Sequence, residues 1–324
     1  MPKLFRRLYR ETDMIRSLQH VALTVPSMAE GLAFYSSMGL EPRVVGGDAV
    51  FRCAGREQDQ LRLIPGNEKG IAWVCWGTRP EEVAQVWGQL RRAGTTLEDA
   101  PRADLDEGLW FRDPDGVLIN LRAAEAAPQT RPAVEINNPG QPYSRLGRRG
   151  APDRKVDARP RKLGHLLKFS TDVNRGVRFY TEMLGMKLSD RIGEKEVAFL
   201  RCGGDSDHHT LAIALSAASG LHHISWEMGN LDQLQLCAER MIAAGYKDAW
   251  GVGRHIYGSN YFHYVRDPWM GLCEFYWDID FIPENANWQA QVADASGDAL
   301  HENLFQWASA PPPEDFLRNY ERAT

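Results

Sequence analysis

The amino-acid sequence predicts an α+β protein made of tandem βαβββ modules, two in each half of the chain. The first observation is an internal repeat, in which LQHVALTVPSMAEGLAFYSSMGLE, at 18–41, returns as LGHLLKFSTDVNRGVRFYTEMLGMK, at 163–187. The second is that the same order of strand, helix and strand–turn–strand patterns follows each copy. Self-similarity of this kind indicates a duplicated unit, and 324 residues are enough for two such domains.

The opening stretch of each half predicts a strand followed by an amphipathic helix. In both copies an alternating segment carries one histidine, His20 or His165, and the helical pattern after it contains a Phe-Tyr pair. The histidine precedes the phenylalanine by 14 residues in both copies. Gly39 and Gly185 follow these patterns and are expected to end the helices, as glycine commonly does.

The later part of each half predicts a second strand, a second helix and a closing hairpin. The stretch GIAWVCWG, at 70–77, parallels GLHHISWEM, at 220–228, and a helical pattern follows each. The closing segments GLWFRDPDGVLINLR and NYFHYVRDPWMGLCEFYW share an Arg-Asp-Pro turn that starts at Arg112 and at Arg266. Each half therefore predicts the βαβββ order twice.

The repeat also predicts the domain boundaries. We expect an N-terminal domain at 1–125, a linker at 126–161, a C-terminal domain at 162–285 and a tail at 286–324. The linker is rich in proline and arginine, which favours an extended conformation. The tail is polar and contains APPPEDF, so we expect it to wrap the surface or to contribute to an oligomer contact.

Composition argues against several functional classes. Hydrophobic residues make up 43% of the chain and charged residues 25%, as in ordinary soluble proteins. A net charge of -5 gives no reason to expect nucleic acid or an anionic membrane as a partner. No apolar run is long enough for a membrane helix, and the basic N-terminus lacks the apolar core of a signal peptide. The five scattered cysteines form no CxxC motif and indicate reduced thiols in a cytoplasmic protein.

The two halves differ at the positions that could bind a metal. The second half offers His165, His223 and Glu274 on three predicted strands, whereas the first half has His20, Trp73 and Asn120. Glu274 lies in the apolar run LCEFYW, and a buried carboxylate is costly unless it is paired, protonated or bound to a metal. Two imidazoles and one carboxylate form the facial set of non-heme Fe(II) sites. We therefore expect one metal site, in the C-terminal domain only.

Four motifs of the second half occur in a fixed order. They are GHLLKF around His165, DHHTLA at His208 and His209, LHHISWE around His223, and the segment from GRH at His255 to Glu274. Together they resemble the two-domain type I extradiol (catechol 2,3-) dioxygenases of the vicinal oxygen chelate superfamily. The resemblance covers nearly the whole chain, apart from the N-terminal arm, the linker and the tail.

The resemblance implies the vicinal oxygen chelate fold and a role for six residues. His165, His223 and Glu274 match the ligands of Fe(II), with Mn(II) as an alternative metal. His209 matches the acid/base histidine, Tyr264 a tyrosine beside the substrate, and His255 the histidine near the substrate oxygens.

The same resemblance implies a reaction and its partners. The enzyme would insert both atoms of O2 into a catechol-type diol next to the two hydroxyls, giving a 2-hydroxymuconic semialdehyde-type product during degradation of aromatic compounds. Its partners would be the catechol, O2 and further copies in a homo-oligomer, without nucleic acid or membrane. The sequence shows no Arg or Lys cluster beside the triad, which favours an uncharged, hydrophobic catechol.

Two other functions remain open at this point. One is a non-redox enzyme of the same superfamily, an isomerase or glyoxalase-like lyase with Zn²⁺, Ni²⁺ or Mn²⁺. Loss of the ligands from the first half disfavours it, since many such enzymes build their site from both modules. The other is a metal-independent binder of aromatic ligands, resembling bleomycin-resistance proteins, which the intact triad disfavours.

Several neighbouring residues also carry expectations. We expect a solvated His208, and His222 and His263 on the strand faces opposite the site, because side chains alternate along a strand. Candidates for an aromatic wall around the substrate are Trp226, Tyr257, Tyr261 and Phe262.

Overall fold

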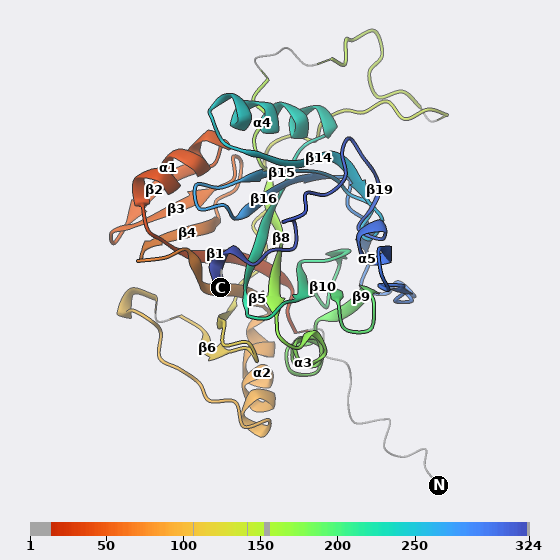
Figure 1. Ribbon diagram of the computed structural model, residues 1–324. Coiled ribbons are helices and arrows are strands. Elements are labelled where there is room, and N and C mark those ends of the chain that lie inside the picture. The colour runs from red at the N-terminus through yellow and green to blue at the C-terminus, as the bar shows by residue number, and fades with distance from the viewer. Residues whose placement is uncertain (1–13, 106, 141, 152–155, 323–324) are drawn as a thin grey trace.

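The structure is a computed structural model that describes residues 14–105, 107–140, 142–151 and 156–322. The first 13 residues of the predicted N-terminal domain lie outside this part. Two large sheets dominate the molecule, one from each half (Figure 1).

The first half forms a seven-stranded sheet with two helices. The strand order is β2-β3-β4-β1-β5-β7-β6. The elements are β1 (Ser17–Val25), α1 (Met28–Ser37), β2 (Glu41–Val45), β3 (Asp48–Arg52), β4 (Asp59–Pro65), β5 (Gly70–Thr78), α2 (Pro80–Arg92), the 3₁₀ turn η1 (Ala103–Leu105), β6 (Leu109–Arg112) and β7 (Leu118–Ala123).

The second half forms a ten-stranded sheet in the order β18-β9-β10-β12-β8-β13-β16-β15-β14-β19. The elements of this half are β8 (Lys162–Ser170), α3 (Val173–Arg178), the π-helical turn η2 (Phe179–Met183), β9 (Lys187–Ile192), β10 (Val197–Arg201), β11 (Ser206–Asp207), β12 (Leu211–Leu215), β13 (Gly220–Glu227), α4 (Leu231–Ala243), β14 (Asp248–His255), β15 (Tyr261–Arg266), β16 (Leu272–Trp277) and β17 (Phe281–Ile282). Strands β11 and β17 pair with each other in a separate two-stranded sheet. The tail adds β18 (Val292–Ala293), α5 (Ala299–Glu302), β19 (Phe305–Ala308) and the 3₁₀ turn η3 (Tyr320–Arg322).

The duplicated α+β architecture is confirmed, with one reduced unit. In three of the four units a helix is followed by three main strands of the sheet. In the unit that begins with β5, the first of these three strands is reduced to a bridge between Glu98 and Trp110. The segment before β6 contains Pro101 and several aspartates, residue types that are depleted in strands.

Local sequence explains where the helices begin. Ser27, Asp172 and Asn230 precede α1, α3 and α4, and the side chain of each accepts a hydrogen bond from a backbone N–H in the first turn. Gly39 and Gly185 follow the first helix of each half with positive φ angles, as the sequence predicts.

Two buried ion pairs join the halves through the repeated Arg-Asp-Pro turns. Asp113, from the turn of the first half, pairs with the buried Lys168 of β8. Asp267, from the turn of the second half, accepts Nζ of Lys69 at 2.6 Å. Each repeated aspartate therefore binds a lysine of the other half, which fixes the relative positions of the two sheets.

One hydrophobic core runs through both halves. Cys273 of β16 points into it, with its sulphur 3.8 Å from the sulphur of Met38. Helix α4 lies over β14, β15 and β16 on this side of the sheet (Figure 1). Side chains alternate in direction along a strand, so Glu274, the residue after Cys273, points to the opposite face of the sheet, where the pocket described below lies. The five cysteines are all buried and free.

The tail extends the second sheet at both ends. Strand β18 pairs with β9 in parallel, and β19 pairs with β14 in antiparallel orientation. Both edges of the sheet that carries the site are thus covered by the chain's own C-terminal segment. This location explains how the tail can reach the pocket described below.

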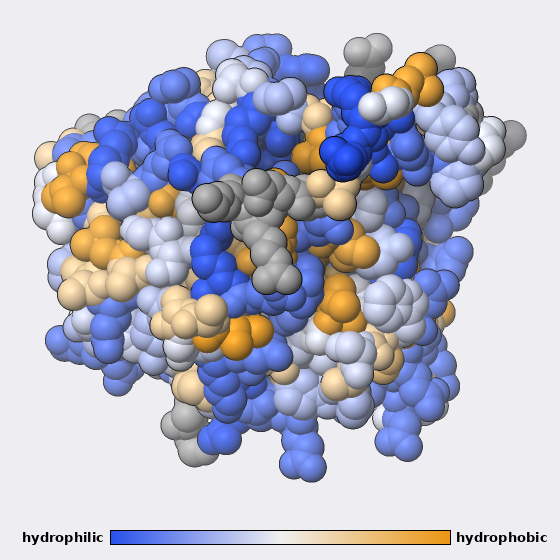
Figure 2. All heavy atoms as spheres, turned by 90° about the horizontal axis from the view of Figure 1, so that it is seen from above, coloured by the Kyte–Doolittle hydropathy of each residue, from blue (hydrophilic) through white to orange (hydrophobic). Residues whose placement is uncertain are grey.

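None of the helices in the described ranges is long and apolar enough to cross a bilayer. On the face shown in Figure 2, hydrophobic residues form small groups among hydrophilic ones. The homo-oligomer expected from the sequence stays a prediction.

Candidate metal centre and substrate pocket

One row of side chains runs across four neighbouring strands of the second sheet. His165 of β8 pairs with Ser225 of β13, which also pairs with Glu274 of β16. Glu274 in turn pairs with Tyr264 of β15. Paired residues on neighbouring strands present their side chains on the same face, and so do residues two apart along a strand. His223, two residues before Ser225, therefore joins the row.

Glu274 lies at the centre of this row and is fully buried. Its Oε2 lies 2.9 Å from Nε2 of His165 and 3.5 Å from Nε2 of His223. Ser225 Oγ donates to the same oxygen at 2.5 Å, and Asn260 Nδ2 donates to Oε1 at 3.3 Å. The carboxylate is thus held from two sides by neutral donors.

The electrostatics of the row favour an ionised carboxylate. Burial raises the pKa of Glu274, but its histidine neighbours, His165 first and then His255 and His223, outweigh burial and hold that pKa well below its usual range. One ligand atom from each of His165, His223 and Glu274 lies within 4.8 Å of the other two. Two imidazoles and one carboxylate fit Fe(II) or Mn(II), and they leave open positions for other ligands.

His222 fixes which nitrogen of His223 faces the centre. Nε2 of His222 lies 2.7 Å from the carbonyl oxygen of Phe316, which can only accept, so this nitrogen carries a proton. Burial lowers the pKa of His222 to about 4, which keeps it neutral near pH 7. Its Nδ1 therefore accepts from Nδ1–H of His223 at 2.6 Å. Nε2 of His223 is left without a proton, and among the described residues it has no hydrogen-bond partner, as a metal ligand requires.

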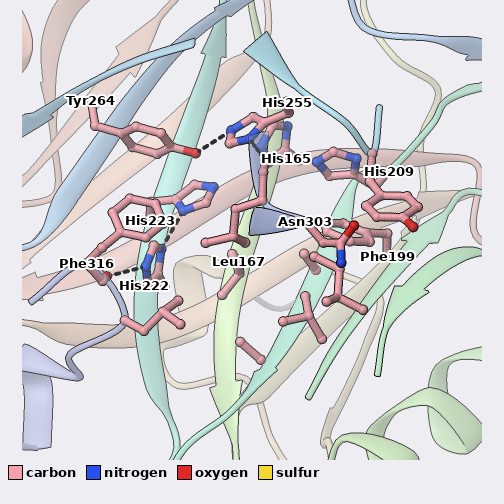
Figure 3. Close-up of a pocket in the computed structure, with 17 residues that line it drawn as sticks. His165, Leu167, Phe199, His209, His222, His223, His255, Tyr264, Asn303 and Phe316 are labelled. Atoms are coloured by element: carbon pink, nitrogen blue, oxygen red, sulfur yellow. Dashed lines mark hydrogen bonds between the residues drawn. The ribbon is translucent and has the colours of Figure 1, made fainter. Parts of the chain in front are cut away.

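The expectation that His222 points away from the site is wrong. The register of β13 against β8 shifts between Leu221 and His223, which marks a β-bulge at His222. A bulge breaks the strict alternation of side chains, and the rings of His222 and His223 therefore lie side by side (Figure 3).

His255 and Tyr264 form a second pair with a defined direction. His255 Nδ1 donates to the carbonyl oxygen of Leu304 at 2.6 Å, so its Nε2 accepts from the hydroxyl of Tyr264 at 3.0 Å. Burial, with the nearby charge of Glu274, raises the pKa of Tyr264 well above its ordinary value. The phenol therefore stays protonated and can act as a donor.

His209 lies beside the row, just before β12. Its ring centroid is 4.3 Å from that of His165 and 5.1 Å from that of Phe199. Burial lowers the pKa of His209 well below its ordinary value, and the neighbouring His165 and His208 add to this effect. Gly258 covers the ring with a φ of 89°, and a Cβ there would lie 3.1 Å from Cε1 of His209. Only glycine combines this backbone conformation with such a close approach.

An apolar pocket opens beside these groups. Its wall comes from β8, β9, β10 and β12 and from the tail, and includes Leu167, Ile192, Val197, Phe199, Leu304 and Phe316 (Figure 3). Within the described ranges no lysine or arginine lines it. Such a wall suits an uncharged ring better than a charged one.

Of the four aromatic candidates for this wall, Tyr257 lines the pocket and stacks on Phe199. The other three do not belong to its lining. Trp226 lies in the main core, Tyr261 stacks on Trp277, and Phe262 stacks behind His255. The aromatic character of the wall was therefore only partly predicted.

The comparisons with known proteins agree with this geometry. Residues 17–121 and 162–275 match the model of the Glyoxalase/Bleomycin resistance protein/Dioxygenase superfamily. The chain belongs to this superfamily.

Three proteins show what this chain is similar to. The chain is 35% identical to Metapyrocatechase 2 of Cupriavidus necator over 96% of this chain and 94% of that protein. It is 25% identical to an iron-dependent extradiol dioxygenase of Rhodococcus jostii, over 78% of this chain and 86% of the relative. The Mn(II)-bound glyoxalase of Novosphingobium aromaticivorans shares the fold, with a TM-score of 0.76, 23% identity and 94% coverage of each chain.

The structure brings together all six residues that the sequence predicted for the site. Among the described residues, one group of potential metal ligands is found, and it consists of His165, His223 and Glu274. It lies in the second half of the chain, as expected. Their roles remain predictions.

Sequence reasoning missed the groups that orient the six. Ser225 and Asn260 bind Glu274, and the carbonyl oxygens of Leu304 and Phe316 bind two histidines. The position of Ser225 two residues after His223, on the same face of one predicted strand, could have suggested it. A backbone carbonyl leaves no signal in the sequence, so the tail's contribution could not have been found.

The outcomes for the two remaining histidines differ. The expectation of a solvated His208 is wrong, because this ring is fully buried between Phe199 and Trp288. His263 was expected opposite Tyr264, and it does bind Gln235 of α4 on the core side of the sheet.

Proposed function

We propose that this protein is an Fe(II)-dependent extradiol dioxygenase that cleaves a catechol-type diol next to its two hydroxyls. The observation that carries this proposal is the arrangement of two imidazoles and a carboxylate beside His209 and the His255–Tyr264 pair, all at one end of an apolar pocket. The names of the relatives, a metapyrocatechase and an extradiol dioxygenase, support the same reaction class.

His165, His223 and Glu274 would hold the metal. When bound there, Fe(II) would act as a Lewis acid on the diol and make electrons available for the reaction with O2. The neutral form of His223 and the ionised form of Glu274 are already set by their hydrogen-bond partners. The ligand types also suit Mn(II), and the iron named for the Rhodococcus jostii relative supports the choice of Fe(II).

Tyr264 and His255 would orient the diol. The Tyr264 hydroxyl stays protonated and donates a hydrogen bond, to Nε2 of His255 in this structure or to a substrate oxygen that comes within reach. His255 is kept in place by the carbonyl oxygen of Leu304. Both groups therefore define the position of an oxygen atom at the inner end of the pocket.

His209 would serve as the acid/base group. Its lowered pKa keeps the ring neutral near pH 7, so it can accept a proton from the reacting diol and return it later. Its contacts with Phe199 and Gly258 exclude water from two sides of the ring. A single base in a dry pocket limits side reactions with solvent protons.

The substrate class follows from the wall of the pocket. Leu167, Ile192, Val197 and Phe199 form an apolar surface that suits an alkyl or aryl substituent, and a carboxylate on the substrate would find no cation there. We propose an uncharged, hydrophobic catechol as the substrate, and a 2-hydroxymuconic semialdehyde-type compound as the product.

O2 uptake by protein reconstituted anaerobically with Fe(II) tests this function. The substrates are catechol, 3-methylcatechol, 4-methylcatechol, 2,3-dihydroxybiphenyl and the charged homoprotocatechuate. We expect O2 uptake together with a yellow ring-cleavage product, and a higher kcat/KM for the uncharged substituted catechols than for homoprotocatechuate.

The outcomes separate the reaction from the metal and the substrate. Uptake with Mn(II) and not with Fe(II) would keep the reaction and change the metal. A preference for homoprotocatechuate would contradict the proposed substrate class only. No uptake with any diol and either metal would contradict the dioxygenase itself and favour an isomerase or lyase of the same superfamily.

A further inference from the structure

A buried chain of hydrogen bonds leads away from His209 on the side opposite the pocket. Nδ1 of His209 lies 3.0 Å from Nδ1 of His208, and Nε2 of His208 lies 2.7 Å from Oδ2 of Asp190. His208 is fully buried and Asp190 is 4% exposed. His209 lines the pocket but His208 does not, so the chain connects the pocket to a carboxylate behind its wall.

The direction of this chain follows from its two ends. Oδ1 of Asp190 accepts the backbone N–H of Gln291 at 2.6 Å, and Oδ2 faces the imidazole. An ionised carboxylate can only accept, so Nε2 of His208 must donate. In a neutral His208 the other nitrogen, Nδ1, then accepts from Nδ1–H of His209. This leaves Nε2 of His209 without a proton.

We propose that Asp190 and His208 are positioning residues that fix the tautomer of His209, so that its Nε2 meets the substrate as a bare base. This inference rests on the proposed function, because it assigns a purpose to the base of that reaction. The same device occurs once more in the site, where the Phe316 carbonyl acts through His222 on Nδ1 of His223.

The surroundings hold His208 in one orientation. Its backbone N–H donates to the carbonyl of Asp280 at 2.7 Å, and its carbonyl accepts from Ser189 Oγ at 2.5 Å. The indole of Trp288, from the tail, packs edge-on against its ring at a centroid distance of 5.6 Å. The backbone bonds fix the position of the residue, and Trp288 and Asp190 fix the orientation of its ring.

The change Asp190→Asn tests the proposal at nearly constant volume. The amide oxygen of the asparagine would still accept from Gln291, which turns the NH₂ group toward His208. Nε2 of His208 must then accept, its Nδ1 donates to His209, and the proton of His209 moves to Nε2. The variant therefore reverses the tautomer while the packing is kept.

We expect Asp190→Asn to lower kcat by roughly 100-fold, within the range that acid–base groups contribute, with KM for the catechol changed less than about threefold. In metal-free protein labelled with ¹⁵N-histidine, the proton of His209 should move from Nδ1 to Nε2, with the signals assigned by comparison with His209→Gln. The matched control is Asp248→Asn, because Asp248 binds Nε2 of His263 at 2.9 Å in a pair outside the pocket. This control should leave kcat unchanged.

A second variant shows whether Asp190 acts through His208 and not through a general loss of structure. His208→Phe removes the middle of the chain, and adding Asp190→Asn to it should have no further effect on kcat, since two residues of one chain are not additive. An unchanged tautomer of His209 in Asp190→Asn would overturn the proposal, even if activity fell. If the wild-type protein cleaved no diol, only the proposed function would fail, and the ¹⁵N spectra would still decide the role of the chain.

Discussion

The two halves of the molecule present corresponding rows of side chains from the same strand positions. In the first sheet His20 pairs with Cys75, Cys75 with Asn120, and Asn120 with Trp110. The second sheet has His165, Ser225, Glu274 and Tyr264 at these places. Only the histidine is kept, and the carboxylate at the centre is replaced by a neutral amide.

The first row is satisfied by its own members. Trp73 stands where the second half has His223, and its indole donates to Nε2 of His20 at 2.8 Å. Cys75 donates to Oδ1 of Asn120 at 3.0 Å, and Nδ2 of Asn120 donates to the carbonyl of Glu107 at 2.9 Å. The lone pair that a metal would need on His20 is therefore occupied.

The difference between the two rows shows that a histidine at the correct strand position is not sufficient to make a metal ligand. In the second half the partner of His223 leaves its Nε2 bare, and the neighbouring histidines keep Glu274 charged. The neighbours decide whether a lone pair remains available. Four changes test this comparison, from the largest expected effect to the smallest.

The change Glu274→Gln gives the second half the neutral amide of the first. We expect it to abolish metal binding and ring cleavage, an effect above the roughly 100-fold that loss of an outer partner causes. Metal content by mass spectrometry and O2 uptake would measure it. Asn120→Ala is the matched control and should lower stability without lowering metal content. A Glu274→Gln protein that kept stoichiometric iron would show that the carboxylate is not a ligand.

The change His209→Gln tests the histidine that lies beside the row of the second sheet. At the corresponding position the first half has Asp59, which pairs with Arg52 at 2.8 Å. We expect kcat to fall by roughly 10²- to 10⁴-fold while iron content stays constant, because the metal ligands are untouched. Steady-state kinetics on iron-loaded protein would measure it. Equal losses of iron and of activity would instead assign His209 to the metal.

The change Ser225→Cys introduces the thiol that Cys75 supplies in the first half. A thiol is a weaker donor than a hydroxyl, so Glu274 loses its 2.5 Å hydrogen bond. We expect metal affinity to fall by roughly 10- to 100-fold, as is typical for partners of a ligand. Competition with a chelator of known affinity would measure it, and Cys75→Ser is the control. Unchanged affinity would show that Asn260 alone suffices to orient the carboxylate.

The change His20→Asn affects stability and its pH dependence, not activity. Burial and the charges of Arg122 and Arg62 lower the pKa of His20 to about 3, whereas its ordinary value is 6.5. Between these values the unfolded chain binds a proton that the folded chain excludes, so stability is full above pH 6.5 and falls as the pH decreases. The loss is at most about 1.4 kcal/mol per pH unit, and less because His20 is partly exposed.

His20→Asn removes this loss and keeps an acceptor for Trp73. Urea unfolding at pH 7.5, 6.5 and 5.5 should show the variant gaining on the wild type as the pH falls. Its O2 uptake at pH 7.5 should equal that of the wild type. Parallel stability curves would contradict the neutral state of His20 in the folded protein.

Much of the site could be predicted from the sequence, because it is encoded by residue type and strand position. The duplicated strands, the helix ends at Gly39 and Gly185 and the set of His165, His223 and Glu274 follow from local patterns, whereas His209, His255 and Tyr264 came from the resemblance to extradiol dioxygenases. The reason is that a strand of period two fixes which side chains share a face. Where that period breaks, as at the bulge of His222, the prediction was wrong.

The sequence by itself determined the duplication and the chemical identity of the groups that could bind a metal. Only the tertiary structure decided which of their nitrogens are bare. The carbonyl of Leu304 acts on His255 from 49 residues away, and that of Phe316 acts on His222 from 94 residues away. Asp190 and Trp288 likewise enclose His208, which sequence reasoning expected in solvent. Every residue carries a backbone carbonyl, so its position in space, and not its presence in the chain, carries the information.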